Sequence, residues 1–474
     1  MTDDEAFMSK TIHRPFQGES AMTVNQDDSG YIGLVLEKLV ITGIKVGDTI
    51  KIIQSDSEHS GILMPRSQVG VDSDHIIIKL DNGYNIGIKL HPEVVITRIK
   101  GVKKKKKPSS EDNSAKLFPL LPTVAVLSTG GTIASKVDYR TGAVNPALSA
   151  QDLYDSVPEL KEHANIEAKV ITSMLSENIH PEDWTKIARS IAKEIKKGVD
   201  GVVVAHGTDT MGYTASALSF ALQNIPVPIA LVGSQRSSDR PSSDAALNLI
   251  GATDLVGRAD AAEVMVVMHA KTDDSFLYAH RGTRVRKSHT SRRDAFQSIN
   301  DYPLFKIEQS NITELNSPLL KRNPERKLKL KPLFEEKVAL IKTHPGISGS
   351  IIDYYVSKEY KGIIIEGTGL GHVPDRIQQN IRNAIDEGLI VAMSSQCISG
   401  RIDMNVYRSG VELLGIGVIS CEDMFAETAL VKLMWLLANT SKPEKIRSLL
   451  GISLVGEIDS RSENAEFVSK REFK

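Results

Sequence analysis

The chain has 474 residues, 41% of them hydrophobic and 25% charged, and its formal net charge is −1. This length exceeds one ordinary core, so two or three domains are expected. The near-zero charge excludes a global field favouring nucleic acid or an anionic membrane.

Two cysteines, Cys397 and Cys421, are too few for a disulfide framework and suit a reducing compartment. No apolar run approaches the roughly 20 residues that cross a bilayer, and the acidic N-terminus lacks signal-peptide features. We therefore expect a cytoplasmic protein without membrane contact.

The first hundred residues have the texture of a small β domain. Residues 1–38 are polar and weakly patterned, and we interpret them as a mobile tail with a short helix near residues 31–38. Short apolar runs between residues 46 and 99 are broken by turns such as Asp-Asn-Gly at 81–83. This rhythm predicts a small antiparallel β-barrel over residues 39–100.

An unbroken lysine run, residues 103–107, is followed by a Pro-Ser-Ser segment. Like charges repel and proline blocks a helix, so residues 101–119 should form an exposed linker. The lysines either contact tRNA phosphates or are a solvated hinge, and we favour the hinge.

From residue 120 the pattern becomes α/β. Continuous apolar runs at 123–127, 201–205, 229–232 and 264–268 alternate with helical stretches such as 181–197 and 214–222. Such runs indicate a parallel sheet covered on both faces. A polar, basic stretch at 300–332 interrupts the pattern, which resumes with strands at 337–341, 362–366 and 389–393. We expect a large lobe over residues 120–336, a smaller one over 337–450, and a C-terminal tail over 451–474.

Three motifs follow predicted strands. The first is Thr-Gly-Gly-Thr-Ile-Ala at 129–134. Its glycines permit a sharp turn and close approach to a ligand, and it lies where open α/β sheets bind ligands. Glycine N–H groups there can hold an oxyanion. The alternative is a plain strand-to-helix turn.

The second motif, His-Gly-Thr-Asp-Thr at 206–210, places a hydroxyl and a carboxylate at the same sheet edge. Thr208 and Asp209 could instead cap the helix that follows. His206 lies against a buried strand, where a histidine is more often a structural hydrogen-bonding group than a general base.

The third motif contains Arg286, Lys287 and Ser288. A lysine close to a threonine hydroxyl can take part in its activation. Alone, Lys287 would pass for a surface lysine. Arg284 and Arg286 are near in sequence and could act on Lys287 as nearby cations. Neighbouring side chains on an extended strand point in different directions, however, so neither arginine need lie beside Lys287.

In this order, with Gly-Ser-Gln-Arg at 233–236 between the second and third, the motifs resemble those of the bacterial-type L-asparaginase family. The resemblance covers roughly residues 122–450 and implies a two-lobed α/β fold that hydrolyses side-chain amides through a threonyl ester. It implies that Thr132 is the nucleophile and that Lys287 activates Thr208 through a hydrogen bond.

The resemblance also implies the substrate contacts. Ser176 would bind the substrate α-carboxylate, Asp209 would help to hold the α-ammonium, and Gly131 would line the substrate site. Glu177 stands where many asparaginases have glutamine, and bears on substrate choice. Residues 400–407 contain no glutamate where many of these enzymes supply one from an adjacent subunit.

The small β domain and linker before this core are similar to the D-subunit subfamily of archaeal glutamyl-tRNA(Gln) amidotransferases. That resemblance implies a chain that supplies ammonia from glutamine to a tRNA-binding E subunit, which converts Glu-tRNA(Gln) to Gln-tRNA(Gln). No cofactor or metal is implied in this chain. ATP and Mg²⁺ would be used by the complex, in the partner subunit, and this subunit would form a homodimer.

Two other functions stay open. One is a stand-alone cytoplasmic asparaginase or glutaminase acting on L-asparagine or L-glutamine. The other is an RNA-binding adaptor with an inactive hydrolase core, against which the intact set Thr132, Thr208, Asp209 and Lys287 argues.

Overall fold

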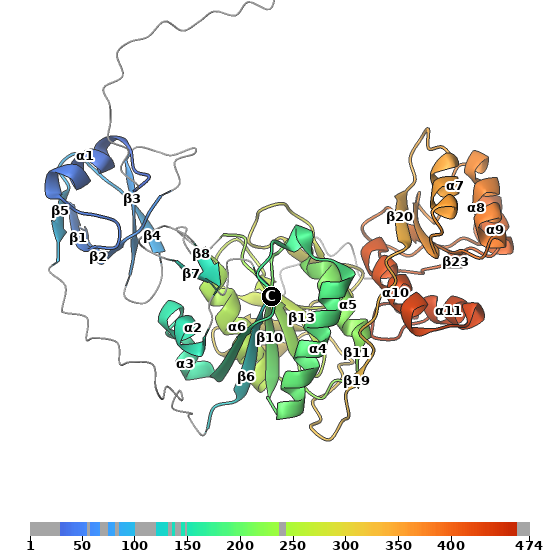
Figure 1. The fold of residues 1–474 in the computed structure, drawn as a ribbon, viewed down its shortest axis with the longest axis horizontal. Helices are drawn as coiled ribbons and strands as arrows, with labels where there is room; N and C mark the ends of the chain where they lie inside the picture. Colours follow the sequence, from blue (N-terminus) through green and yellow to red (C-terminus); the bar gives the residue numbers. More distant parts are fainter. Residues whose placement is uncertain are drawn as a thin grey trace, which may run out of the picture.

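The computed structural model describes residues 29–54, 57–66, 74–80, 85–99, 120–130, 135–137, 144–146, 149–236 and 243–461. The predicted linker with its lysine run lies outside these ranges, as do Gly131 and Thr132. The described elements form three groups along the chain: an N-terminal β domain, a large α/β lobe and a small α/β lobe (Figure 1).

The N-terminal group is an antiparallel sheet with one helix. Its order is β4-β3-β2-β1-β5, and all neighbouring strands are antiparallel. The predicted antiparallel arrangement is confirmed. Among the described residues the strands form an open sheet with β4 and β5 at its edges, and no pairing closes it into the predicted barrel. The elements are α1 (Gly33–Thr42), β1 (Thr49–Gln54), β2 (Ser57–Leu63), β3 (His75–Lys79), β4 (Asn85–Lys89) and β5 (Val95–Arg98).

Helix α1 confirms the short helix predicted near residues 31–38, but the helix is packed into the domain instead of belonging to a mobile tail. Tyr31, Val35 and Leu39 are buried and share one apolar cluster with Ile50 and Ile96 of the sheet. The helix therefore crosses the predicted limit at residue 38. Burial of three large side chains fixes this segment in the domain.

The large lobe is built on an eight-stranded sheet of order β18-β17-β14-β13-β12-β10-β6-β9. Its strands are β6 (Thr123–Ser128), β9 (Asn165–Val170), β10 (Gly201–Ala205), β12 (Ile229–Val232), β13 (Val264–His269), β14 (Leu277–Arg281), β17 (Phe305–Glu308) and β18 (Asn311–Glu314). Strands β9, β6, β10, β12 and β13 are parallel. β14, β17 and β18 continue the sheet antiparallel, so the polar stretch at 300–332 contributes the last two strands of this sheet, β17 and the edge strand β18.

Helices cover both faces of this sheet, as the continuous apolar strands predict. Alternate residues of β6, β10, β12 and β13 pack against α6 on one face and against α4 and α5 on the other. The helices are α2 (Ala150–Ser156), α3 (Leu160–His163), α4 (Pro181–Lys197), α5 (Met211–Ala221) and α6 (Ala245–Arg258), with a 3-10 turn, η1 (Ser176–Asn178). Short strand pairs complete the lobe: β7 (Ser135–Val137) with β8 (Val144–Pro146), β11 (Leu222–Gln223) with β19 (Lys329–Leu330), and β15 (Val285–Lys287) with β16 (Phe296–Ser298).

The small lobe has a parallel sheet of order β20-β21-β22-β23. Its elements are β20 (Val338–Lys342), α7 (Ser350–Ser357), β21 (Gly362–Gly367), η2 (Asp375–Ile377), α8 (Gln378–Asp386), β22 (Ile390–Ser395), α9 (Arg408–Gly415), β23 (Ile419–Ser420), α10 (Ala426–Asn439) and α11 (Pro443–Leu450). Helices α7, α8 and α9 pack on one face and α10 on the other.

Helix α10 joins the two lobes. It lies between the small sheet and the large lobe (Figure 1), and Trp435 on α10 stacks on Phe220 of α5 with ring centroids 5.8 Å apart. Ala217, Phe220 and Trp184 of the large lobe belong to the same apolar cluster as Ile364 and Ile390 of the small sheet. The lobes therefore share a hydrophobic core, which resists relative movement.

The segment after α11 also differs from the predicted tail. Glu457 and Lys432 are both fully buried and form an ion pair of 2.6 Å. Lys432 Nζ also donates to the backbone oxygens of Leu450 and Ile452. Residues 451–459 thus belong to the folded core, because a buried charge needs this set of partners.

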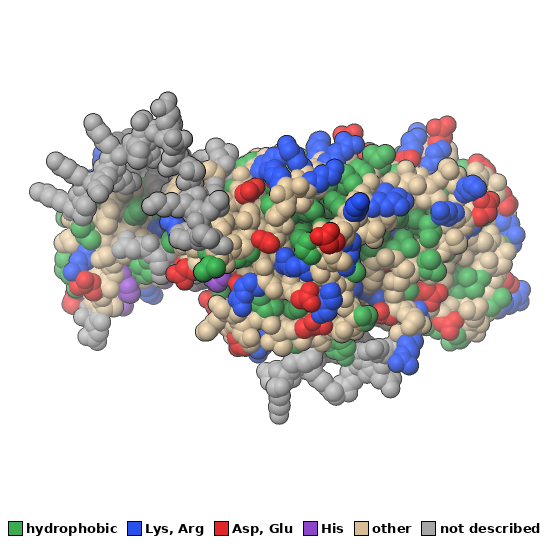
Figure 2. Space-filling model, turned by 90° about the horizontal axis from the view of Figure 1, so that it is seen from below, with side chains coloured by type: hydrophobic (Ala, Val, Ile, Leu, Met, Phe, Trp, Pro, Cys, Tyr) green, Lys and Arg blue, Asp and Glu red, His purple; other side chains and the backbone are tan. Residues whose placement is uncertain are grey.

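The surface mixes charges of both signs. Figure 2 shows Lys and Arg side chains gathered over part of the large lobe, with Asp and Glu side chains elsewhere on the same face. Among the described residues, no helix is long and apolar enough to cross a membrane.

Candidate functional site

The carboxyl ends of β6 and β10 meet at one edge of the large sheet. Ser128 is the register partner of Ala205, and both the backbone N–H and the Oγ1 of Thr129 donate to the oxygen of Ala205, each at 3.0 Å. Thr172, after β9, donates its Oγ1 to the oxygen of Thr129 (2.8 Å). These bonds hold the start of the first motif beside the second.

Gly130 is required by its surroundings. Its φ is +121°, and a Cβ there would come within 2.2 Å of the Met174 backbone oxygen. Only glycine accepts both conditions without strain. The rest of the first motif, including the predicted nucleophile Thr132 and Gly131, lies outside the described residues.

Ser176 lies against the second motif. Its side chain is buried, and a Cβ on Gly207 would meet the Ser176 Cβ and Oγ at 2.8 Å. Thr210 Oγ1 donates to the Ser176 backbone oxygen (2.7 Å). Ser176 therefore contacts the two residues that flank Thr208 and Asp209, and Glu177 follows it as an exposed residue of η1. The expected contact of Ser176 with the substrate α-carboxylate stays a prediction.

Lys287 reaches the second motif from a distant part of the chain. Its Nζ donates to Thr208 Oγ1 (2.9 Å) and to Asp209 Oδ1 (2.7 Å). The Lys287 side chain is 14% exposed and that of Asp209 is 64% exposed. The predicted lysine–threonine hydrogen bond is present, at the rim of the lobe rather than deep inside it.

The helix-capping interpretation of Thr208 and Asp209 is wrong. Helix α5 begins at Met211, its N-cap is Thr210, and no side chain caps it. Asp209 instead pairs with Lys287. Both side chains contact Lys287 at the sheet edge instead of capping α5. The turn between β10 and α5 sets their position.

His206 has a structural place. It is buried, its Nδ1 contacts the Gly207 oxygen (2.6 Å), and its Nε2 contacts Thr214 Oγ1 (2.9 Å). Because a carbonyl only accepts, Nδ1 carries the proton and Thr214 donates to Nε2. Burial lowers the pKa of His206 to about 4, so the ring is neutral near pH 7. This confirms the structural interpretation of His206.

Gly233 packs against the candidate site, although in the sequence it stands out only as part of the Gly-Ser-Gln-Arg motif. A Cβ there would come within 2.8 Å of Thr208 Cγ2 and of the His206 oxygen. Asn248 Nδ2 donates to the Gly233 oxygen (2.9 Å), while Asp244 accepts the N–H groups of Gln235 and Arg236. The turn after β12 is therefore fixed directly against Thr208. A glycine directly after a buried strand was the available signal.

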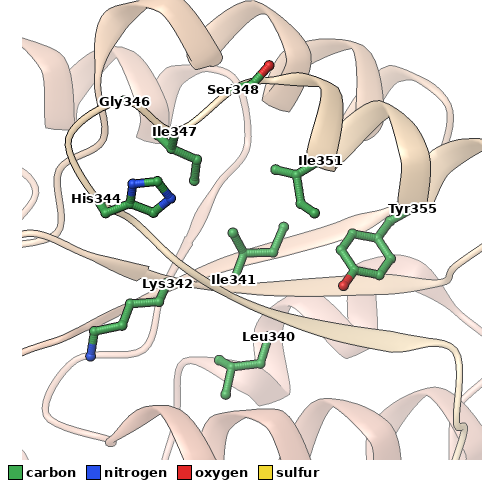
Figure 3. A pocket seen from close by; sticks show the side chains of 9 residues that line it. All are labelled: Leu340, Ile341, Lys342, His344, Gly346, Ile347, Ser348, Ile351 and Tyr355. Atoms are coloured by element: carbon green, nitrogen blue, oxygen red, sulfur yellow. The ribbon is translucent and has the colours of Figure 1, made fainter. Parts of the chain in front are cut away.

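A cavity of about 340 Å³ lies in the small lobe, between β20 and α7. Figure 3 shows Ile341, Ile347, Ile351 and Tyr355 around it. None of the predicted site residues lines it. Among the described residues, no group of three or more His, Cys, Asp or Glu side chains is arranged to hold a metal ion.

Three family models match the chain. Residues 123–320 match the N-terminal domain of asparaginase, and residues 337–450 match the glutaminase/asparaginase C-terminal domain. Residues 44–99 match the GatD N-terminal domain.

Relatives match almost the whole chain. The D subunit of the glutamyl-tRNA(Gln) amidotransferase of Pyrococcus furiosus is 50% identical over 430 residues, covering 90% of this chain and 97% of the relative. The corresponding D subunit of Metallosphaera sedula is 46% identical over 434 residues, covering 91% and 97%.

Solved structures match the two-lobed core. An L-asparaginase of Thermococcus kodakarensis is 32% identical with a TM-score of 0.64, covering 72% of this chain and 100% of that structure. L-asparaginase I of Vibrio cholerae is 30% identical with a TM-score of 0.63, covering 72% and 99%. The predicted asparaginase-like fold is confirmed.

Proposed function

This chain belongs to the D-subunit family of glutamyl-tRNA(Gln) amidotransferases, and from that premise we propose that it is the glutamine-hydrolysing subunit of a tRNA-dependent amidotransferase. Identity of 50% over 90% of the chain, including the N-terminal domain, carries this conclusion. The contact of Lys287 with Thr208 and Asp209 supports amide hydrolysis as the chemistry.

Thr132 is the proposed nucleophile. Its hydroxyl attacks the side-chain carbonyl carbon of glutamine, and the hydroxyl proton passes toward the Thr208–Lys287 pair. Backbone N–H groups of the Gly-Gly turn, including that of Gly131, stabilise the oxyanion that forms. A threonine hydroxyl is a weak nucleophile near pH 7, so an adjacent acid–base pair is needed.

The tetrahedral intermediate collapses with cleavage of the C–N bond. The nitrogen takes a proton and leaves as ammonia, and the glutamyl group remains as an ester on Thr132. Water then adds to the ester, releasing glutamate and restoring the threonine hydroxyl. The chain uses no cofactor in these steps.

Ser176 and Asp209 hold the α-carbon end of the substrate in this proposal. Ser176 binds the α-carboxylate. Lys287 contacts Oδ1 of Asp209, so the second carboxylate oxygen can accept the α-ammonium group. Glu177, exposed in η1, is a second carboxylate for that ammonium and favours amino-acid amides over simple amides.

The complex supplies the remaining chemistry. The E subunit binds Glu-tRNA(Gln), activates it with ATP and Mg²⁺, and uses the ammonia to form Gln-tRNA(Gln). We further propose that this subunit forms a homodimer and works in the cytoplasm, where aminoacyl-tRNA is consumed by translation.

A stand-alone L-asparaginase or glutaminase is the second candidate. It is favoured by the solved L-asparaginases, whose full length matches the two-lobed core without the N-terminal domain.

Ammonia release from glutamine and from asparagine separates the two, measured with and without the E subunit and Glu-tRNA(Gln). The amidotransferase subunit should be stimulated by partner and tRNA, and removal of residues 1–110 should abolish that stimulation. Thr132→Val, which replaces a hydroxyl with a methyl, should reduce ammonia release to background. A near-normal rate in that variant would remove Thr132 from the mechanism.

A further inference from the structure

The strand that carries Lys287 is not part of the large sheet. β15 has three residues and, among the strands that the structure describes, pairs with β16 alone in a separate two-stranded sheet. Two short strands alone are marginally stable in water. Contacts outside this hairpin must therefore fix the place of Lys287. Val285 and Phe296 pack into the apolar core of the large lobe, and the residues that flank Lys287 contact the small lobe.

Arg284, which precedes β15, has a fully buried side chain held by the C-terminal third of the chain. It forms ion pairs with Asp423 (3.0 Å) and Asp459 (2.9 Å), and its Nε donates to the Gly456 oxygen (3.0 Å). Asp423 lies just before α10. A buried guanidinium has a defined position when its N–H groups are engaged in this way.

Arg286 makes the second connection. Its Nε lies 3.0 Å from Glu427 Oε1, in the first turn of α10. Successive side chains of a strand point to opposite faces. Arg286 therefore extends toward the small lobe, while its neighbour Lys287 extends toward Thr208.

Hydrogen bonds hold both ends of the hairpin to the same region. Thr428 Oγ1 donates to the Thr283 oxygen (3.0 Å). After β16, Asn300 Nδ2 donates to the Asp423 oxygen (2.7 Å), and Asn300 Oδ1 accepts the Gly400 N–H (2.7 Å). The start of α10 and the residues just before it thus contact the hairpin on both sides of Lys287.

We propose that the small lobe positions Lys287, with Asp423 and Glu427 acting through Arg284 and Arg286 as positioning residues for the amidase. This inference rests on the proposed function. Lys287 Nζ reaches Thr208 at 2.9 Å, and a displacement of about 1 Å in such a group can cost on the order of 10²-fold in rate.

The first test replaces Glu427 by Gln in the full chain, assayed together with the E subunit. This keeps the shape of the side chain and removes the charge that holds Arg286. We expect kcat for glutamine hydrolysis to fall about tenfold with KM unchanged, since Glu427 touches no group that binds substrate. Glu427→Asp, which keeps the charge, should recover most of the loss.

Glu263→Gln is the matched control. Glu263 pairs with Arg281 at 2.9 Å, is as buried as Glu427, and lies within the large lobe. The melting temperature of Glu263→Gln should fall at least as far as that of Glu427→Gln, while the kcat of Glu263→Gln stays near the wild-type value. Asp459→Asn is a milder second variant, because the Asp459 side chain is half-exposed, and a two- to fivefold loss of kcat is expected.

A double-mutant cycle with Lys287→Met decides whether Glu427 acts through Lys287. If it does, Glu427→Gln has no further effect in the Lys287→Met background. A tenfold loss in both backgrounds, or an unchanged kcat in Glu427→Gln alone, would overturn the inference. A wild-type rate in Lys287→Met alone would instead refute the proposed role of Lys287, which is a different failure.

Discussion

The two sides of the candidate site are built in different ways. The turn after β10, with Thr208 and Asp209, belongs to the large sheet and is packed against Ser176 and Gly233. The hairpin that carries Lys287 lies outside that sheet. Val285 and Phe296 pack it into the apolar core of the large lobe, and Arg284 and Arg286 join it to the small lobe through ion pairs. The first side is fixed by close packing within one lobe, and the second depends on contacts with both lobes. Substitutions on the two sides should therefore differ in how much activity and how much stability they remove.

The largest expected effect is at the contact between the two sides. Lys287→Ala and Thr208→Val each remove one partner of the 2.9 Å hydrogen bond. Each should lower kcat for glutamine hydrolysis by at least about 10²-fold, the usual cost of a lost acid–base group. Steady-state ammonia release measures this. If both variants keep more than a tenth of the wild-type rate, the contact is not part of the chemistry.

A substitution on the packed side should cost both activity and stability. A Cβ on Gly207 would press on Ser176 at 2.8 Å, so Gly207→Ala must move either Ser176 or the Thr208 turn. We expect kcat/KM to fall about tenfold or more and the melting temperature to fall by several degrees. Gly198→Ala is the control for the loss of a glycine: no neighbour would meet its Cβ, so only stability should fall. Unchanged kcat/KM in Gly207→Ala would show that this side tolerates movement.

Lys432→Met should mainly lower the free energy of unfolding, with a smaller effect on activity. It leaves the Glu457 carboxylate buried without its ion pair, and breaking such a pair typically costs about 3–5 kcal/mol. Urea unfolding measures this loss. Because residues 456–459 also hold Arg284, a smaller loss of kcat should accompany it. The double variant Lys432→Met/Glu457→Gln should recover most of the stability, and equal instability of both would contradict the ion-pair explanation.

The smallest expected effect concerns pH and the packed side alone. Burial lowers the pKa of His206 from 6.5 to about 4, so between these values the unfolded chain binds the proton more readily than the folded one. The stability from His206 is complete above pH 6.5 and is lost as pH falls toward 4, by up to roughly 3 kcal/mol.

His206→Asn should therefore make the unfolding free energy depend less on pH between 6.5 and 4. Urea titrations at several pH values measure this, and buried His280, whose pKa is also lowered, leaves a residual dependence in the variant. Ammonia release at pH 7 should fall less than in Lys287→Ala. A loss of ammonia release as large as that in Lys287→Ala would instead show that His206 takes part in catalysis.

Sequence reasoning was strongest where one physical signal dominates. The apolar runs at 201–205 and 229–232 coincide with β10 and β12, and the amphipathic stretch at 181–197 coincides with α4. It was weaker at chain segments whose structure depends on distant partners. The tail predicted from residue 451 contains the buried Glu457. The tail predicted up to residue 38 contains the first six of the ten residues of α1, whose helix was predicted but whose burial was not. Neither the polarity nor the length of these segments shows which distant residues they contact in the fold.

By itself the sequence determined the main strands and helices of the two lobes and the residue types at the strand ends, among them a hydroxyl, a carboxylate and an amine of the kinds that amide hydrolysis uses. Hydrophobic periodicity and backbone preferences depend on residues close together in the sequence, so they can be predicted without knowledge of the fold. Only the tertiary structure decided that Lys287 meets Thr208 across 79 positions, that Gly233 makes room for Thr208, and that Asp423 and Glu427 hold the lysine strand. Those relations depend on how the two lobes pack, and packing is a property of the whole chain.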